Sequence, residues 1–329
     1  MKLAFFDTKS YDIPGFDRYA APARIEIKYF EPNLNIDTVS LAAGFDAVCV
    51  FVNDSITAEV VEKLYEMGVK AIVLRCAGFN NVDLKACRGK LRVFRVPAYS
   101  PHAVAEHAMA LLLTVNRRIH KAHNRTREFN FSLQGLTGFD LYGKTVGVIG
   151  TGKIGRVFAD ICRGFGMKVL AYDKFPNPEA GLDYVELDGL FEKSDVISLH
   201  CPLTVETDHI IRSGSIRRMK DGVVIINTSR GGLVNSEDLI QGLKSGKVGA
   251  AALDVYEEEG EVFYEDLSGH ILQDDKLVRL IAMPNVIVTS HQAFLTKEAL
   301  DNIAHTTVNN LVRFFEGNPD ESTEVVYQK

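Results

Sequence analysis

The chain has 329 residues, a formal net charge of −6 and 46% hydrophobic residues, a composition typical of globular proteins. This length exceeds that of a typical single domain and favours two. The acidic balance, without a basic run, argues against a nucleic-acid partner, and no stretch approaches the roughly 20 apolar residues that span a bilayer. Five scattered cysteines without a Cys-x-x-Cys pair, and an N-terminus without a signal-peptide pattern, favour a cytoplasmic protein. The spacing of the histidines predicts no metal site.

The first hundred residues alternate short apolar runs with helical patterns. Strands are expected at 3–6, 25–30, 47–52, 71–75 and 92–96. A helix is expected over 57–67, with Thr57 as its N-cap and Gly68 just beyond its end. Short apolar strands separated by helices predict a parallel sheet that is covered on both faces.

Two features follow these strands. The loop 75–81 lies at a strand's carboxyl end, where Gly78 would let backbone amides approach an anion or would simply serve the turn. Residues 103–127 predict one long helix, apolar in its first half and basic in its second. The apolar half is expected to be buried between domains or subunits, and therefore favours a homodimer or homotetramer. The basic half is expected to face solvent.

A glycine-punctuated turn follows the apolar run 146–149. Gly150, Gly152 and Gly155 fit G-x-G-x-x-G, in which the first glycine allows a sharp turn, the second admits a pyrophosphate and the third lets helix and strand pack closely. Asp173 ends the next strand, 23 residues after Gly150 (173 − 150), where a carboxylate can bind both ribose hydroxyls. The unit therefore predicts dinucleotide binding and favours NAD over NADP, although the neighbouring Lys174 weakens that preference.

Further strands are expected at 195–200, 223–228, 249–255 and 286–289. Each of them ends in polar residues, and the carboxyl ends of parallel strands meet at the ligand-binding edge of a sheet. The polar segments are 201–204, 228–231, 254–259 and 290–294.

Three residues in these segments suit reduction of a carbonyl by a dinucleotide. Histidine side chains in general titrate near neutrality and suit a proton donor, and His291 lies at one of these strand ends. Arg230 can bind a carboxylate through two parallel hydrogen bonds, and Glu259 could accept from the imidazole and favour its charged form. From spacing alone each stays a candidate, because a lone Arg or Glu on a loop is usually a surface charge.

Longer motifs make the chain resemble the D-isomer-specific 2-hydroxyacid dehydrogenase family throughout its length. They are Gly147-Val-Ile-Gly-Thr-Gly-Lys-Ile-Gly155, Ser198-Leu-His-Cys-Pro-Leu203, Ile226-Asn-Thr-Ser-Arg-Gly231 and Ala252-Leu-Asp-Val-Tyr-Glu-Glu-Glu259. Segments 75–83, 96–101 and 291–296, and the long acidic stretch between Glu259 and Pro284, look like the fermentative D-lactate dehydrogenase branch. Ser290 departs from the pattern, since many relatives have proline before the catalytic histidine.

The resemblance implies roles for individual residues. Arg230 would anchor the substrate carboxylate, His291 would donate the proton and Glu259 would support His291. The substrate site would also be lined by Ala77, Gly78, Tyr99 and Phe294. NAD would be bound by Gly150, Gly152, Lys153, Ile154, Gly155, Asp173, Cys201, Pro202, Thr207, Thr228, Ser229, Arg230 and Asp254, with Asp254 near the nicotinamide amide.

The family's architecture implies two doubly wound parallel-sheet domains, with a Rossmann NAD-binding domain inserted into a flavodoxin-like substrate domain. The boundaries expected are 1–100 and 299–329 for the substrate domain and 101–298 for the NAD-binding domain, with closure of the two upon the substrate. The activity implied is NADH-dependent reduction of pyruvate to D-lactate. The alternatives are a dehydrogenase for larger 2-oxo acids and, more remotely, an NAD-sensing corepressor.

Overall fold

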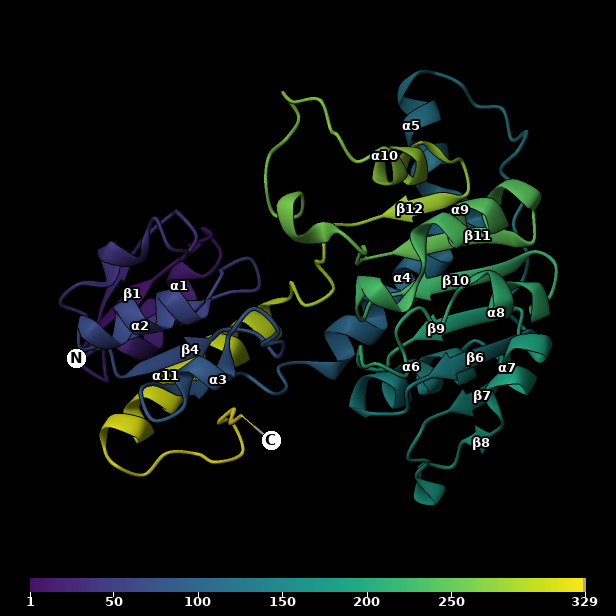
Figure 1. Cartoon of the computed structure of the whole chain (residues 1–329). Helices are drawn as coiled ribbons and strands as arrows, with labels where there is room; N and C mark the ends of the chain where they lie inside the picture. Colours follow the sequence, from purple (N-terminus) through teal and green to yellow (C-terminus); the bar gives the residue numbers. More distant parts are fainter. Residues whose placement is uncertain (328–329) are drawn as a thin grey trace. The chain divides into compact units, whose positions relative to one another are not determined.

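The computed structural model describes residues 1–327 and divides the chain into two compact units (Figure 1). Unit 1 comprises Met1–Ser100 and the residues from Phe294 onward, and unit 2 comprises Pro101–Ala293. The second division falls after Ala293, five residues before the expected boundary after residue 298 (298 − 293). Among the described residues, no helix is long and apolar enough to cross a bilayer.

Unit 1 contains a five-stranded sheet in the order β2-β1-β3-β4-β5, and every pairing is parallel. The strands are β1 Lys2–Phe5, β2 Glu26–Tyr29, β3 Ala47–Val50, β4 Ala71–Leu74 and β5 Arg92–Phe94. This is the flavodoxin-like order. Every residue of β3 and β4 is buried, as expected for central strands that are covered on both faces.

The helices of unit 1 pack in pairs, α1 against α11 and α2 against α3. They are α1 Ile13–Ala20, α2 Ala58–Glu66, α3 Leu84–Cys87 and α11 Lys297–Phe315, with a short 3-10 turn, η1 Val39–Ala42. The predicted caps of α2 are confirmed, because the Thr57 side chain accepts from the Val60 amide and Gly68 has φ +84°. Helix α11 returns the chain to the first hundred residues and contacts β4.

Unit 2 contains a seven-stranded sheet in the order β12-β11-β10-β9-β6-β7-β8, again wholly parallel. Its strands are β6 Thr145–Ile149, β7 Lys168–Tyr172, β8 Asp183–Tyr184, β9 Val196–Leu199, β10 Val223–Asn227, β11 Val248–Leu253 and β12 Val286–Val288. If β6 is counted as the first strand, the order is 3-2-1-4-5-6 with one further strand, which is the Rossmann arrangement. The predicted fold class is therefore confirmed for both units.

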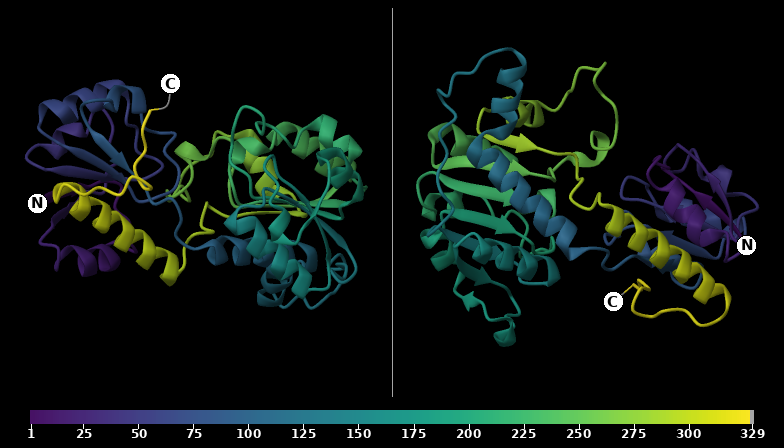
Figure 2. Two further views of the ribbon diagram at one scale, coloured as in Figure 1. Left: turned by 90° about the horizontal axis from the view of Figure 1, so that it is seen from below. Right: turned by 180° about the vertical axis from the view of Figure 1, so that it is seen from behind.

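Two helical layers cover the sheet of unit 2 (Figure 2). Each layer has its own hydrophobic core against the sheet. Helices α4 Pro101–Arg117 and α6 Lys153–Gly164 pack together on one face. The other layer consists of α7 Leu187–Lys193, α8 Ser213–Arg218, α9 Ser236–Ser245 and α10 Asp275–Ala282. The remaining short elements are α5 Ile119–Arg127 and the 3-10 turns η2 Pro178–Ala180, η3 Gly231–Leu233 and η4 Glu259–Glu261.

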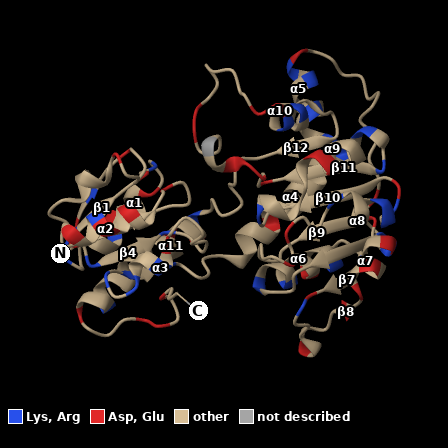
Figure 3. Cartoon of the chain, in the orientation of Figure 1, with Lys and Arg blue, Asp and Glu red and all other residues tan. Residues whose placement is uncertain are grey.

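The expected single helix over 103–127 is wrong in one respect. It is broken at Arg118, whose φ of +54° is left-handed and ends α4 before α5 begins. The apolar side of α4, including Ala105, Leu112 and Val115, is buried in the core of unit 2. This face is therefore no argument for a subunit contact, and the oligomeric state stays a prediction. Helix α5 carries several Lys and Arg residues (Figure 3), and none of its residues is buried.

Candidate active site at the carboxyl edge of unit 2

The three glycines of the turn after β6 are each explained by their surroundings. Gly150 has φ +94°, and a Cβ there would lie 2.5 Å from the Cys201 amide nitrogen. A Cβ at Gly155 would lie 2.0 Å from the carbonyl oxygen of Gly150. A Cβ on Gly152, in contrast, would meet nothing within 4 Å, so this position faces open space. The first and third glycines serve packing, and the second leaves room for a ligand.

Helix α6 begins at that open space. Its N-cap is Gly152, which offers no side chain to the free amides of the first turn, and Lys153 and Ile154 are its first two residues. Uncapped amides at the N-terminus of a 12-residue helix attract an anion. The turn and the helix therefore fit a dinucleotide pyrophosphate.

Asp173 directly follows β7 and faces the same turn. Its Oδ2 accepts from the Thr151 amide at 2.6 Å and from the Thr151 hydroxyl at 3.0 Å, and Oδ1 accepts from the Phe175 amide. A carboxylate is thus fixed beside the glycine turn, where it would repel a 2′-phosphate. The Lys174 ammonium lies 2.8 Å from Glu206, so its charge is paired outside this contact.

Hydrogen bonds join the loops that follow the neighbouring strands β9 and β10. The Ser229 hydroxyl donates to the Cys201 carbonyl at 2.6 Å, and the Thr207 hydroxyl donates to the Pro202 carbonyl at 2.7 Å. The buried hydroxyl of Thr228 has no hydrogen-bond partner among the described residues. Because an unpaired buried hydroxyl is costly, Thr228 fits a position that a bound ligand satisfies.

Arg230 follows β10 and directly precedes η3. Its Nη1 donates to the Ser229 carbonyl at 2.7 Å, and within the described part of the chain it pairs with no carboxylate. The next residue must be glycine, since a Cβ on Gly231 would lie 1.9 Å from the Tyr256 carbonyl oxygen. The half-buried guanidinium therefore retains donors for an external carboxylate.

His291 and Glu259 form a hydrogen-bonded pair. The Nδ1 atom of His291 lies 2.9 Å from Glu259 Oε1, and the two side chains are 18% and 24% exposed. The Tyr256 amide donates to the other oxygen of Glu259 at 2.9 Å, and the Tyr264 hydroxyl donates to the His291 carbonyl at 3.1 Å. No hydrogen bond of the described residues uses His291 Nε2. The pair thus orients the imidazole and leaves Nε2 for a reacting group.

The sheet brings these three side chains to one edge. Strands β10, β11 and β12 are neighbours, with Asn227 opposite Leu253 and Leu253 opposite Val288. Arg230, Glu259 and His291 follow these three strand ends in that order. Since neighbouring strands lie about 4.8 Å apart, the backbones of Arg230 and His291 emerge roughly two strand spacings from each other.

Asp254 directly follows β11 and is fully buried. Its Oδ1 accepts from the Thr289 hydroxyl and the Gln292 amide, and its Oδ2 accepts from the Ala293 amide. Burial alone would raise the pKa of this carboxyl, but hydrogen bonds from His107 and Thr289 outweigh it and lower the pKa. A ligand contact at Asp254, as expected from the sequence, would have to share these occupied oxygens.

The candidate substrate residues outside this edge belong to unit 1. The Ala77 carbonyl accepts from Arg95 Nη1 at 2.9 Å, and because a trans peptide points its C=O and N–H in opposite directions, the Gly78 amide faces away from Arg95. The centroid of the Phe294 ring lies 6.3 Å from that of Tyr99, 6.0 Å from that of Phe51 and 6.5 Å from that of Tyr11. The structure therefore groups Tyr99 with Phe294.

Several neighbours of these residues carry no sequence signal. Tyr11 and Phe51 come from apolar or mixed segments that resemble ordinary core. Tyr264 lies in the acidic stretch after β11, and Thr289 ends a strand like many threonines. His107 lies within an apolar helix, where nothing in its spacing shows that it reaches Asp254.

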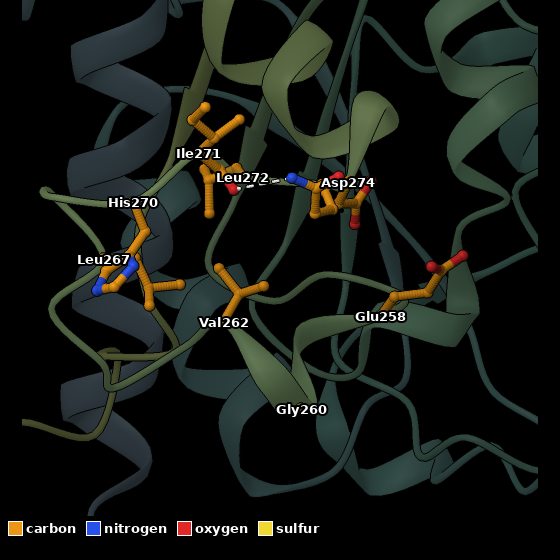
Figure 4. Close-up of a pocket in the computed structure, with 9 residues that line it drawn as sticks. Glu258, Gly260, Val262, Leu267, His270, Ile271, Leu272 and Asp274 are labelled. Carbon is orange, nitrogen blue, oxygen red and sulfur yellow. Dashed lines mark hydrogen bonds between the residues drawn. The ribbon is translucent and has the colours of Figure 1, made fainter.

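A separate pocket of about 720 Å³ lies beside this edge (Figure 4). It is formed by the segment after β11, and none of the sequence-predicted site residues lines it. Its lining consists of Glu258, Gly260, Val262, Leu267, His270, Ile271, Leu272, Gln273 and Asp274. The pocket belongs to the acidic stretch rather than to the strand ends.

Comparison with known proteins agrees with this geometry. Residues 109–293 match the model of the NAD binding domain of D-isomer specific 2-hydroxyacid dehydrogenases. The chain belongs to the D-isomer specific 2-hydroxyacid dehydrogenase family, and NAD is its cofactor.

Individual relatives span almost the whole chain. A 2-hydroxyacid dehydrogenase homolog of Haemophilus influenzae is 53% identical over 96% of this chain and 97% of its own length. The D-lactate dehydrogenase of Escherichia coli is 51% identical over 96% of this chain and 98% of its own length. Its apo structure superposes with a TM-score of 0.91, at 49% identity over 99% of this chain and 100% of that chain. The protein is accordingly an NAD-dependent dehydrogenase of this family.

Proposed function

We propose that the protein is a D-lactate dehydrogenase that reduces pyruvate with NADH. The observation that carries the proposal is the hydrogen bond between His291 and Glu259. His291 follows β12, which lies two strands away from β10, the strand that Arg230 follows. A similar protein, the D-lactate dehydrogenase of Escherichia coli, supports the choice of substrate.

NADH, when bound, supplies the hydride for C2 of the substrate, and the residues of the chain handle the carboxylate and the proton. Arg230 binds the substrate carboxylate through two parallel hydrogen bonds. Glu259 accepts from His291 Nδ1, so protonated His291 carries its transferable proton on Nε2, which donates it to the carbonyl oxygen.

In this proposal, the residues of unit 1 that line the substrate site limit the size of the 2-oxo acid. The amides of Ala77 and Gly78 would bind the carboxylate, and the rings of Tyr99 and Phe294 would leave room for a methyl group. One additional methylene is worth only about 1–3 kcal/mol of discrimination, so larger 2-oxo acids remain the second candidate. The Haemophilus influenzae relative, which is named only as a 2-hydroxyacid dehydrogenase homolog, supports that alternative.

We further propose a set of NAD contacts at the carboxyl edge of unit 2. The open space at Gly152 and the unpaired hydroxyl of Thr228 support it. The proposed residues are Gly150, Gly152, Lys153, Ile154, Gly155, Asp173, Cys201, Pro202, Thr207, Thr228, Ser229, Arg230 and Asp254.

A substrate panel tests the reaction. Oxidation of NADH is followed with pyruvate, 2-oxobutyrate and 2-oxoisocaproate, and the product's chirality is determined with stereospecific assays. We expect pyruvate to give the highest kcat/KM and D-lactate to be the product. A preference for 2-oxoisocaproate would establish the larger-substrate dehydrogenase, and NADH binding without turnover would favour the corepressor.

The His291→Gln variant tests the proton donor. We expect kcat to fall by about 10²-fold or more, with the Kd for NADH nearly unchanged, because proton transfer typically contributes that factor. The control is His123→Gln, which changes an exposed histidine on α5 and should leave kcat unaltered. Full activity of His291→Gln would remove His291 from this role.

We also propose a cytoplasmic homodimer or homotetramer. All five cysteines are buried free thiols, which suits a reducing compartment. Three exposed apolar side chains after α5, those of Phe129, Phe131 and Leu133, support self-association. Light scattering of the purified protein measures the subunit number, and a monomer at micromolar concentration would contradict this proposal.

A further inference from the structure

We propose that His107 is a positioning residue, which through Asp254 and Thr289 holds the loop that carries His291. This inference rests on the proposed function of His291, and it adds a residue on α4 that is far from His291 in the sequence. All the contacts involved lie within unit 2.

One buried carboxylate organises the loop 289–293. Asp254 Oδ1 accepts from the Thr289 hydroxyl at 2.6 Å and from the Gln292 amide at 2.9 Å, and Oδ2 accepts from the Ala293 amide at 2.8 Å. The Asp254 carbonyl also accepts from the His291 amide at 2.7 Å. Four of the five residues of this loop therefore donate a hydrogen bond to Asp254.

His107, on helix α4, contacts the same carboxylate. Its Nε2 lies 3.2 Å from Asp254 Oδ1 and 3.3 Å from the Thr289 hydroxyl oxygen. In the described part of the chain, His107 is the one basic side chain paired with Asp254. A neutral or protonated imidazole that donates from Nε2 satisfies the carboxylate, and the protonated form also balances its charge.

Helix α4 makes His107 a fixed support. Val104 and Leu111, three residues before and four residues after His107, are 4% and 3% exposed and lie on its side of the helix. The helix also packs against α6, β10 and β11. His107 is 19% exposed, so it lies at the end of the buried surface rather than deep within the core.

The His291 backbone needs such support. Its φ of +50° lies in the left-handed region, which is unfavourable for a residue with a side chain. Strained backbones of this kind persist only where their surroundings hold them in place. If the loop relaxed, the imidazole would lose its 2.9 Å contact with Glu259, and Nε2 would no longer point consistently toward the substrate.

Two substitutions with different chemistry separate positioning from general stability. His107→Phe keeps a flat ring but removes the donor, whereas His107→Gln restores a donor without a titratable ring. The matched control is His102→Gln, which alters an exposed histidine on the same helix. For each variant, kcat, the KM for the 2-oxo acid, the Kd for NADH and the melting temperature are measured.

We expect His107→Phe to lower kcat about 10-fold, since misplacing a reacting group by a fraction of an ångström has effects of this order. The Kd for NADH should stay within about 2-fold, His107→Gln should recover most of kcat, and His102→Gln should match the parent protein. The proposal is overturned if His107→Phe keeps the parental kcat. It is also overturned if both His107 variants lose kcat only in parallel with NADH affinity and melting temperature.

A spectroscopic measurement tests the contact without turnover. The imidazole 15N signals of His291, assigned by their loss in His291→Gln, report on its Nδ1–Glu259 hydrogen bond in the protein without substrate. We expect them to shift in His107→Phe and to return toward the parental position in His107→Gln. If His291→Gln were fully active, the proposed role of His291 would fail, whereas unshifted signals in His107→Phe would overturn this inference alone.

Discussion

In each of the two units an arginine follows a strand of the parallel sheet, but within the described part of the chain only the arginine of unit 1 is paired with carboxylates. In unit 1, the Arg75 guanidinium follows β4 and is 2% exposed, between the rings of Phe5 and Phe51 at 4.7 and 4.6 Å. Its Nε lies 3.3 Å from Asp12, and its Nη1 donates to the Phe6 carbonyl. In unit 2, the Arg230 guanidinium follows β10 and is half-buried, and it has no carboxylate partner among the described residues.

This difference separates charges that stabilise a fold from charges that serve a ligand. Arg75 has internal partners for its charge and its donors, so nothing about it requires a bound molecule. The edge of unit 2 instead combines an open glycine position, an unpaired buried hydroxyl and an arginine with donors to spare. Groups that are left unsatisfied at a strand end, rather than charge itself, therefore mark the ligand site.

The largest effect is expected from a substitution that breaks the buried ion-pair cluster of Arg75, Asp7 and Asp12 in unit 1. In Arg75→Leu, the carboxylates of Asp7 and Asp12 lose their buried counter-ion. Removing one partner of such a cluster destabilises a protein by about 3–5 kcal/mol, which urea unfolding followed by circular dichroism would measure. The control Arg88→Leu removes an exposed arginine and should change stability little. If Arg75→Leu were as stable as the parent protein, the cluster would not contribute to the stability of unit 1.

A smaller effect concerns Asp54, which is also buried near Arg75. Burial raises the pKa of this carboxyl from 3.8 to about 7, although Arg75 and the amides of Phe51 and Leu34 favour its charged form. Because the folded-state pKa is the higher one, the contribution to stability is complete below about pH 4 and is lost as the pH rises through 7.

The variant Asp54→Asn should remove this component. Stability measured by urea unfolding should fall between pH 5 and pH 7 more steeply in the parent than in Asp54→Asn, by at most about 1.4 kcal/mol per pH unit. The slope is diagnostic, because the amide also loses one of the two backbone hydrogen bonds at every pH. Equal slopes would show that Asp54 is ionised throughout this range.

The same contrast explains what could be predicted from the sequence. Alternating apolar runs and the glycine turn were sufficient for two parallel sheets, because strand burial and turn geometry are local properties. The break at Arg118 could not be predicted, since a left-handed arginine within a helical pattern has no local signal. Similarly, Arg75 and Arg230 both follow a buried strand, and only the packing of Phe5 and Phe51 makes one of them internal. The contact of His107 with Asp254 joins residues 147 positions apart (254 − 107) and depends on how α4 crosses the sheet.

The last prediction concerns Arg230, the arginine of unit 2 that has no carboxylate partner among the described residues. Arg230→Lys keeps the positive charge but cannot form two parallel hydrogen bonds with a carboxylate. We expect kcat/KM for pyruvate to fall on the order of 10- to 100-fold, the equivalent of losing one charge-assisted hydrogen bond. The Kd for NADH should change far less, and Arg156→Lys, a half-buried arginine of α6 that lies outside the proposed site, is the matched control. If Arg230→Lys retained the parental kcat/KM, the free donors of Arg230 would not bind the substrate, and the unsatisfied groups of this edge would need another ligand to explain them.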